Sequence, residues 1–160
     1  MKLIPLYQGR SALVDDDDYE RLLGFKWIYT GGYVNRKPYC PSVNGVRKYR
    51  NVSLHREIMN PPDGMVVDHI DGNVFNNQKT NLRICTHREN IMNQRTQIRV
   101  KASKYKGVYR DKRRNTWNAR IKVNQKTIHI GVFLNEDDAA RAYNIAAITH
   151  FGEFARLNAA

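Results

Sequence analysis

Apolar and polar residues alternate in short runs over the first third of the chain. The runs at 2–6, 11–14, 27–29 and 33–35 predict strands, because side chains in a strand point alternately to its two faces. Asn44-Gly45 predicts a tight hairpin turn, since both residues accept the backbone angles that such a turn requires. This part of the chain is therefore expected to be rich in β-structure.

Four consecutive carboxylates, at 15–18, precede a short helix-like stretch at 19–23. Negative charge at a helix start satisfies free backbone amides and interacts favourably with the helix dipole. We therefore expect a helix at this run, with capping as the role of its carboxylates and a metal site as the alternative.

The segment 66–94 carries the most informative pattern. Two valines followed by a polar pair, at 66–69, predict a strand that ends in side chains available for chemistry. A second apolar run at 82–85 predicts another strand. Thr86 and Glu89 form a capping-box pattern, so a helix is expected to begin directly after Thr86. The expected order is strand, loop, strand, helix.

Strands and turns alternate again after residue 105, and a helix follows them. Asn135 is the expected cap of this helix, with Asp138 three residues later as in a capping box. Small residues recur at helical spacing beyond it, so the helix can lie close to a sheet. In the strand before it, one face is apolar (Trp117, Ala119, Ile121 and Val123) and the other polar (Asn118, Arg120 and Lys122).

Charge narrows the choice of partner. The chain has 27 Lys and Arg against 15 Asp and Glu, a formal net charge of +12, which favours a polyanion. Between Arg99 and Lys126 eleven basic residues accompany one acid, Asp111, as in a segment that follows a phosphate backbone. Cys40 and Cys85 form no Cys-x-x-Cys pair, so we expect two reduced thiols.

The polar pair at the end of the first predicted strand suits phosphodiester hydrolysis. This reaction needs a base that activates water and a divalent cation that neutralises charge on the departing oxygen. His69 and Asp68 can supply the base and a ligand for the cation. Both can serve one site only where the strand ends or bends, and the adjacent Asp71-Gly72 turn makes such an end plausible. His87 and Asn90 share one face of the following helix.

The pattern DHIDGN…NN…TNLR…EN…N, together with the preceding LHRE at His55, resembles the HNH nuclease family over roughly 40 residues. The resemblance implies a site of two strands and a helix around a metal ion. It implies His69 as general base, Asp68 as metal ligand and Asn81 as the residue that holds the loop. Asn90 takes the second ligand position, where the family name has its final His, and His87 is the alternative. Oxygen ligands favour Mg²⁺, with Mn²⁺ as the second choice.

The last third of the chain resembles the APETALA-type DNA-binding domain of plant ethylene-response factors, through YKGV, WNARI, HIGVF and NEDDAARAYNIAA. The resemblance implies a three-stranded sheet packed on one helix, with DNA contacts from the sheet face. Tyr109 and Asp111 stand where plant members commonly have arginines, so their base preference is not transferred. For Trp117, core packing and DNA contact are equally favoured roles. The positions carried over as DNA contacts are Lys106, Arg110, Trp117, Arg120 and Lys122.

We therefore predict an α+β protein: an HNH ββα-metal nuclease domain followed by a small three-stranded antiparallel sheet packed on one helix. The expected divisions are an HNH domain at 1–98 (core motif 55–94), a basic linker at 99–104 and an APETALA-type domain at 105–160.

The predicted activity is metal-dependent cleavage of duplex DNA by a monomeric nicking enzyme of a phage or other mobile element. The alternatives are a regulator that binds DNA without cutting it and a basic RNA-binding protein. The N-terminus lacks the apolar stretch of a signal peptide and no run is long enough to span a membrane, so a cytoplasmic protein is expected.

Overall fold

The computed structural model describes residues 1–38, 51–94 and 103–160 and divides into two compact units, Met1–Asn90 and Ile91–Ala160. The predicted Asn44-Gly45 turn and Cys40 lie outside the described residues, as does most of the predicted linker at 99–104. The division falls eight residues before the expected end of the first domain at 98. The expected domain boundaries therefore stay predictions.

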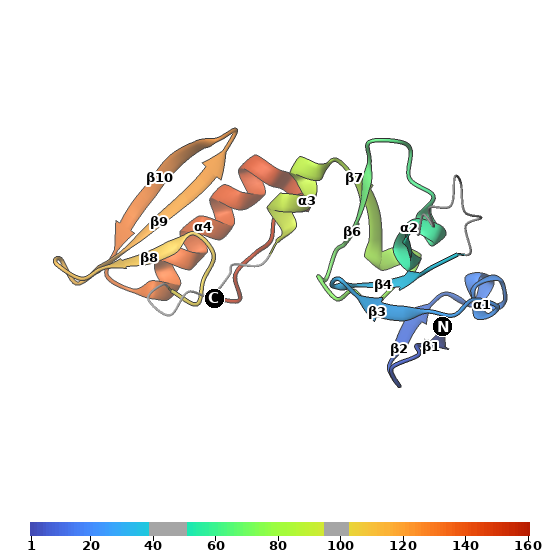
Figure 1. The fold of residues 1–160 in the computed structure, drawn as a ribbon. Coiled ribbons are helices and arrows are strands. Elements are labelled where there is room, and N and C mark those ends of the chain that lie inside the picture. Colours follow the sequence, from blue (N-terminus) through green and yellow to red (C-terminus); the bar gives the residue numbers. More distant parts are fainter. Residues whose placement is uncertain (39–50, 95–102) are drawn as a thin grey trace, which may run out of the picture. The chain divides into compact units, whose positions relative to one another are not determined.

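The first unit begins with an antiparallel pair, β1 (Lys2–Pro5) and β2 (Ser11–Val14), followed by helix α1 (Asp16–Leu23) (Figure 1). Both strands were expected from the periodicity, and the helix from the acidic run at 15–18. Trp27 is almost fully buried and its indole nitrogen donates to the Leu22 carbonyl at 2.9 Å. The core of this unit consists of Ile4, Leu6, Ala12, Val14, Leu22, Trp27, Val34 and Leu54.

A second antiparallel sheet in this unit has the order β3 (Ile28–Thr30), β4 (Tyr33–Arg36) and β5 (Val52–Ser53). Helix α2 (Leu54–Met59) follows β5 directly and ends at Asn60, which has left-handed backbone angles. Six residues are too few to show a helical period, so this helix could not be expected from the sequence. It buries Leu54 and His55 inside the unit.

The central segment has the predicted order of elements. Strands β6 (Val66–His69) and β7 (Leu82–Cys85) pair antiparallel, a 3-10 turn η1 (Lys79–Asn81) precedes β7, and helix α3 (His87–Asn93) follows it. The predicted capping box is confirmed. The Glu89 carboxylate accepts from the Thr86 amide at 2.7 Å, and the Glu89 amide donates to the Thr86 hydroxyl at 3.3 Å.

The second unit contains an antiparallel sheet of order β10-β9-β8, formed by β8 (Val108–Asp111), β9 (Thr116–Val123) and β10 (Lys126–Phe133). Helix α4 (Glu136–Phe151) packs against it, and the turn η2 (Gly152–Phe154) follows (Figure 1). The alternation predicted for β9 is confirmed: Ala119 and Ile121 are buried, and Arg120 and Lys122 are exposed.

Small residues allow α4 to approach the sheet closely, as expected. Ala139, Ala140 and Ala147 are fully buried in the core of the second unit. The Asn135 side chain caps α4 by accepting from the Asp137 amide at 2.9 Å. Asp138 does not complete the predicted capping box among the described contacts; its carboxylate pairs with Arg141.

Among the described residues, no helix combines the length and the apolar character that crossing a membrane requires.

Candidate active site

The register of β6 and β7 places Asp68 opposite Arg83. The guanidinium of Arg83 donates to one carboxylate oxygen of Asp68, Oδ2, from Nε at 3.0 Å and from a terminal nitrogen at 2.8 Å. Both side chains are largely buried: Asp68 is 7% exposed and Arg83 is 11% exposed. The carboxylate predicted to bind a metal is thus held at a site that already accommodates positive charge.

His69 follows Asp68 and has different neighbours. Its ring is buried, and Nε2 lies 3.2 Å from the side-chain oxygen of Asn77. The ring of His55, from α2, meets it edge to face with 5.1 Å between the centroids. The Tyr33 ring packs on the His55 ring, also with 5.1 Å between the centroids. A polar contact and an aromatic contact therefore fix the orientation of His69.

Burial favours the neutral form of both imidazoles. It lowers the pKa of His69, although the hydrogen bond with Asn77 and the charges of Asp71 and Asp68 oppose the change. Burial lowers the pKa of His55 to about 3, with further contributions from His69 and the positive charge of Arg56. A neutral imidazole is the form that accepts a proton, so the lowered pKa of His69 favours the form that a general base requires.

Asn81 holds together the two ends of the loop between β6 and β7. Its amide nitrogen donates to the Asp71 carboxylate at 3.0 Å and to the Asn76 carbonyl at 2.8 Å. Its side-chain oxygen accepts from the Asp71 amide at 3.1 Å. These contacts suit the loop-holding role predicted for Asn81, which stays a prediction, and Asn81 itself does not contact His69 in any described hydrogen bond.

The N-terminal strand pair secures the same loop from the other side. The Leu13 amide donates to the Phe75 carbonyl and the Asn77 amide donates to the Leu13 carbonyl, each at 2.8 Å. The carboxylate of Asp15 accepts from the Lys79 amide at 2.7 Å. Capping was expected of the carboxylates at 15–18. The Asp15 side chain, at the N-cap of α1, makes no cap hydrogen bond, because its carboxylate is used by the start of η1, 64 residues away.

The rest of the acidic run is paired with a lysine. The ligand atoms of Asp15, Asp17 and Asp18 lie within 4.8 Å of one another. The Lys79 ammonium lies 2.7 Å from Asp17 and 2.9 Å from Asp18. A cation of the protein therefore already pairs with two of the three carboxylates that the sequence offered as an alternative metal site.

The thiol of Cys85, at the end of β7, precedes α3. The buried thiol of Cys85 has its pKa raised first by burial and then by the charge of Asp68, and it also senses Glu89 and the Asn90 backbone. Asn90 is half-buried and His87 is exposed. Asp68 and the start of α3 thus both influence the Cys85 thiol, and joint metal binding by Asp68 and Asn90 stays a prediction.

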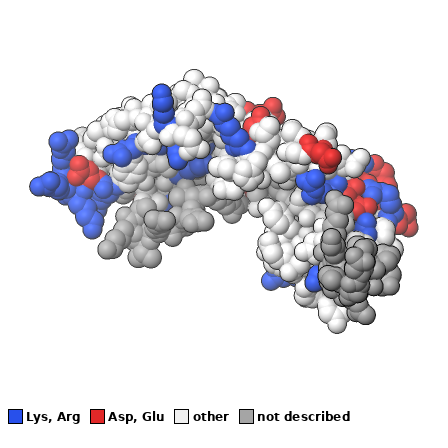
Figure 2. All heavy atoms as spheres, turned by 45° about the horizontal axis from the view of Figure 1, so that its top comes forward, with Lys and Arg blue, Asp and Glu red and all other residues white. Residues whose placement is uncertain are grey.

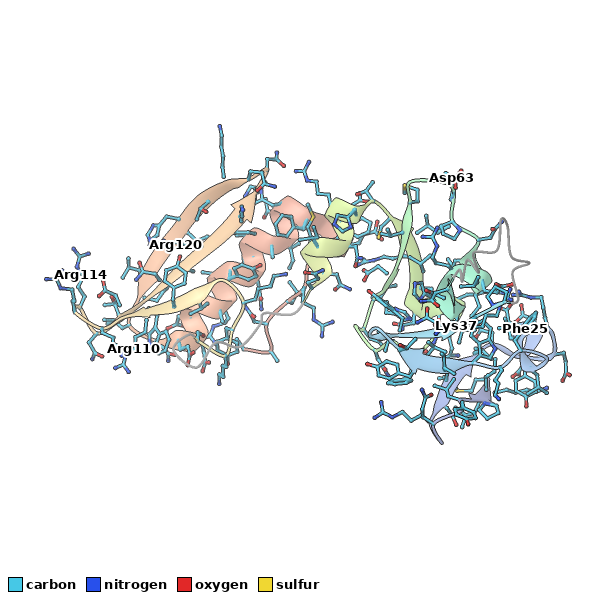
Figure 3. The ribbon with its side chains drawn as sticks, in the orientation of Figure 1. Phe25, Lys37, Asp63, Arg110, Arg114 and Arg120 are labelled. Atoms are coloured by element: carbon cyan, nitrogen blue, oxygen red, sulfur yellow. The ribbon has the colours of Figure 1, made fainter. Side chains whose placement is uncertain are left out.

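In the second unit, the sheet face opposite α4 carries two of the predicted DNA contacts. Arg120 and Lys122 are exposed there, and the Arg120 guanidinium lies 4.6 Å from the centre of the Tyr109 ring. Arg120 lies along the sheet, whereas Arg110 and Arg114 lie toward the β8–β9 turn (Figure 3). Figure 2 shows basic side chains gathered at that end, where Lys112, Arg113 and Arg114 are exposed.

The other three predicted contacts are placed differently. The Lys106 ammonium donates to the carbonyls of Met92 at 2.6 Å and Gln94 at 2.8 Å, and burial lowers its pKa to about 8. Arg110 pairs in register with Trp117, on the side of the sheet that faces α4, and donates to Asn115 at 2.5 Å. Trp117 is half-buried against the core.

Asn77 and Arg83 are the site residues that the sequence did not single out. Both stand in the quoted pattern, in its NN and TNLR elements, but their spacing from His69 and Asp68 does not predict a contact. Their partners become visible only when the loop closes and the two strands take their register.

Comparison with known proteins adds two findings. Residues 59–92, which contain β6, the loop, β7 and most of α3, match the family model described as HNH endonuclease. Over 157 residues the chain is 32% identical to an uncharacterised HNH endonuclease of Acanthamoeba polyphaga mimivirus. The alignment covers 94% of this chain and 76% of the viral protein, so the similarity extends through both units.

Proposed function

This chain belongs to the HNH endonuclease family, and from that premise we propose that it hydrolyses phosphodiester bonds of duplex DNA with His69 as general base and one divalent metal ion. The observation that supports this most directly is the buried, oriented His69, which follows the buried Asp68 directly in β6. In this arrangement His69 accepts a proton from water, and the hydroxide forms the new bond to phosphorus.

The donor set fits a hard cation. Asp68 offers a carboxylate and Asn90 an amide oxygen, which are ligands that Mg²⁺ and Mn²⁺ accept. The guanidinium of Arg83 against Asp68 indicates that the site tolerates positive charge. When bound, the metal supplies charge that stabilises the phosphate and the departing oxygen. We propose Asp68 and Asn90 as its ligands on β6 and α3, with His87 as the alternative to Asn90.

We further propose that the second unit is a duplex-binding domain of the APETALA type. Its three-stranded sheet packed on one helix is consistent with that assignment, and its exposed face carries Arg120 and Lys122. These two residues are the strongest candidates for DNA contact. Lys106 could reach a phosphate only by leaving the Met92 and Gln94 carbonyls. Arg110 and Trp117 lie toward the other side of the sheet and would contact DNA at its edge.

The direct test is incubation of the purified protein with supercoiled plasmid in Mg²⁺, in Mn²⁺ and in chelator. We expect cleavage only with metal, and we expect His69→Ala to remove it while DNA affinity stays within about twofold, because a base acts on the transition state. Cleavage by His69→Ala within tenfold of the wild-type rate would exclude the role of His69. DNA that is bound but uncut under all conditions would support the alternative, a regulator that binds DNA without cutting it.

The ligand assignment has its own test. Asp68→Ala is expected to be inactive at every practical metal concentration, whereas Asn90→Ala is expected to regain part of its activity as the metal concentration rises. His87→Ala serves as the matched control from the same helix. An inactive His87→Ala beside an active Asn90→Ala would reverse the assignment.

We propose that the protein is a monomer that nicks one strand, since one base and one metal align one scissile phosphate. Open circles are then expected well before linear DNA, with sedimentation near the mass of 18.6 kDa. Linear product from the start, at a rate that rises with the square of protein concentration, would indicate a dimer that breaks both strands. The viral relative is consistent with the proposed origin in a phage or other mobile element.

A further inference from the structure

We infer that Asn77 fixes the tautomer of His69, so that Nε2 carries the hydrogen and Nδ1 is the atom that receives the proton from water. The assignment of the tautomer stands on the structure, and the role of Nδ1 rests on the proposed function of His69 as base. Asn77 is thus a positioning residue: it acts on the reaction through the imidazole.

The orientation of the Asn77 amide is set by its second contact. Its nitrogen donates to the Val74 carbonyl at 3.0 Å, and its oxygen faces Nε2 of His69 at 3.2 Å. Turning the amide over would place its oxygen against the Val74 carbonyl, and two acceptors do not bond. The oxygen therefore stays toward His69. Because an amide oxygen only accepts, Nε2 must donate, and in a neutral imidazole this leaves the lone pair on Nδ1.

The backbone around Asn77 cannot easily release this contact. Asn77 is 1% exposed, and its own amide donates to the Leu13 carbonyl at 2.8 Å. Two residues later, the Lys79 amide donates to the Asp15 carboxylate at 2.7 Å. Leu13 in β2 and Asp15 just after β2 thus hold the backbone at Asn77 and at Lys79. The Asn77 side-chain amide is therefore fixed before substrate arrives.

His55 holds the imidazole from another side. Its ring meets His69 edge to face at 5.1 Å, with an angle of 74° between the planes. Rotation of the His69 ring by half a turn would move Nε2 away from Asn77 and bring a carbon atom to a buried acceptor, which is costly because the lost hydrogen bond is not replaced by water. Ring orientation and tautomer are therefore coupled.

The proton balance follows from this assignment. A water proton moves to Nδ1, the hydroxide oxygen bonds to phosphorus, and the bond from phosphorus to the departing sugar oxygen breaks. The departing oxygen takes a proton from solvent, and His69 then returns its extra proton from Nδ1 to solvent. Nε2 of His69 keeps its hydrogen throughout and donates it to the Asn77 side-chain oxygen, so the site returns to its starting state.

The experiment is a long-range proton–nitrogen correlation spectrum of the uniformly ¹⁵N-labelled full-length protein, in chelator and without DNA, at about pH 8, where an imidazole of ordinary or lowered pKa is neutral. His69→Ala identifies the His69 signals by their loss. We expect the Nε2–H pattern for the wild type and a shift toward the Nδ1–H pattern in Asn77→Leu. Asn73→Ala, which loses only a loop hydrogen bond to the Phe75 amide, is the matched control and is expected to keep the wild-type pattern.

An Nδ1–H pattern in the wild type overturns the inference even if Asn77→Leu fails to fold, and so does an unchanged pattern in a folded Asn77→Leu. In cleavage assays we expect Asn77→Leu to lower kcat by about 10- to 100-fold, by analogy with residues that orient metal-binding imidazoles, with KM for plasmid DNA within about twofold. A wild-type protein that shows the Nε2–H pattern without cleaving DNA would remove the proposed function and leave the tautomer assignment standing.

Discussion

The carboxylate of Asp68 and the guanidinium of Arg83 form a buried ion pair in which two donors of Arg83 share one oxygen of Asp68, at 2.8 and 3.0 Å. The pair joins β6 to β7 at the position where metal binding is proposed. A buried carboxylate that loses its partner keeps its desolvation cost without compensation, so removal of either side alone is expected to be strongly destabilising.

The first prediction tests this coupling. Arg83→Met is expected to lower the free energy of unfolding by about 3 kcal/mol in chelator, because Asp68 stays buried and charged. Asp68→Asn combined with Arg83→Met should lose about 2 kcal/mol less than the sum of the two single variants. Chemical denaturation of the four proteins measures the cycle. Additive losses would mean that the pair contributes no interaction energy.

The second prediction concerns His55 and pH. The folded pKa of His55 is about 3, below the ordinary value of 6.5, so unfolding takes up a proton between these values. Stability is then fully present above about pH 6.5 and falls as pH falls toward 3. His55→Phe should reduce the slope of unfolding free energy against pH by up to about 1.4 kcal/mol per unit between pH 6 and 4.

His150→Gln is the control for this measurement, since His150 is exposed on α4. It is expected to keep the wild-type slope. Equal slopes for His55→Phe and the wild type would show that His55 does not resist protonation in the folded protein.

The third prediction separates DNA contacts from structural cations. Arg120→Gln and Lys122→Gln are each expected to reduce the slope of log affinity against log salt by about one unit, as loss of one phosphate contact does. If Arg120 contacts a base edge, its variant should instead change sequence preference. Lys106→Met should lower stability with no change in slope, because its ammonium binds the Met92 and Gln94 carbonyls. A smaller slope for Lys106→Met would place that amine on the DNA.

The fourth prediction concerns Gly107, which has φ +75 and lies against α4. A Cβ there would approach the Tyr143 ring to 2.3 Å and the Arg120 carbonyl to 2.5 Å. Gly107→Ala combines overpacking with backbone strain and should cost about 2 to 5 kcal/mol of unfolding free energy. Gly152→Ala is the control, because Gly152 also has positive φ but nothing within 4 Å.

We expect Gly152→Ala to cost about 1 to 2 kcal/mol, the backbone part alone. Thermal or chemical denaturation compares the two variants. Equal costs would mean that the close approach of α4 to Gly107 does not contribute.

The sequence by itself determined the features that depend on near neighbours. The Thr86–Glu89 capping box, the alternation of β9 and the Asn135 cap all involve residues a few positions apart, so spacing alone predicts them. The HNH pattern also placed the residues proposed as base and metal ligands at the end of a strand and the start of a helix. Membership of the family was readable from the pattern at 55–93, which contains the residues that match its model, 59–92.

Only the tertiary structure decided which distant groups meet. Asn77 contacts His69 because the loop between β6 and β7 closes on itself, and Asp15 binds Lys79 across 64 positions. Lys106, which the sequence predicts as a DNA contact, donates to two backbone carbonyls. The type of a side chain limits its possible partners, but burial and long-range pairing select among them, and a charge or an amide that is desolvated must take the partner that the fold brings near.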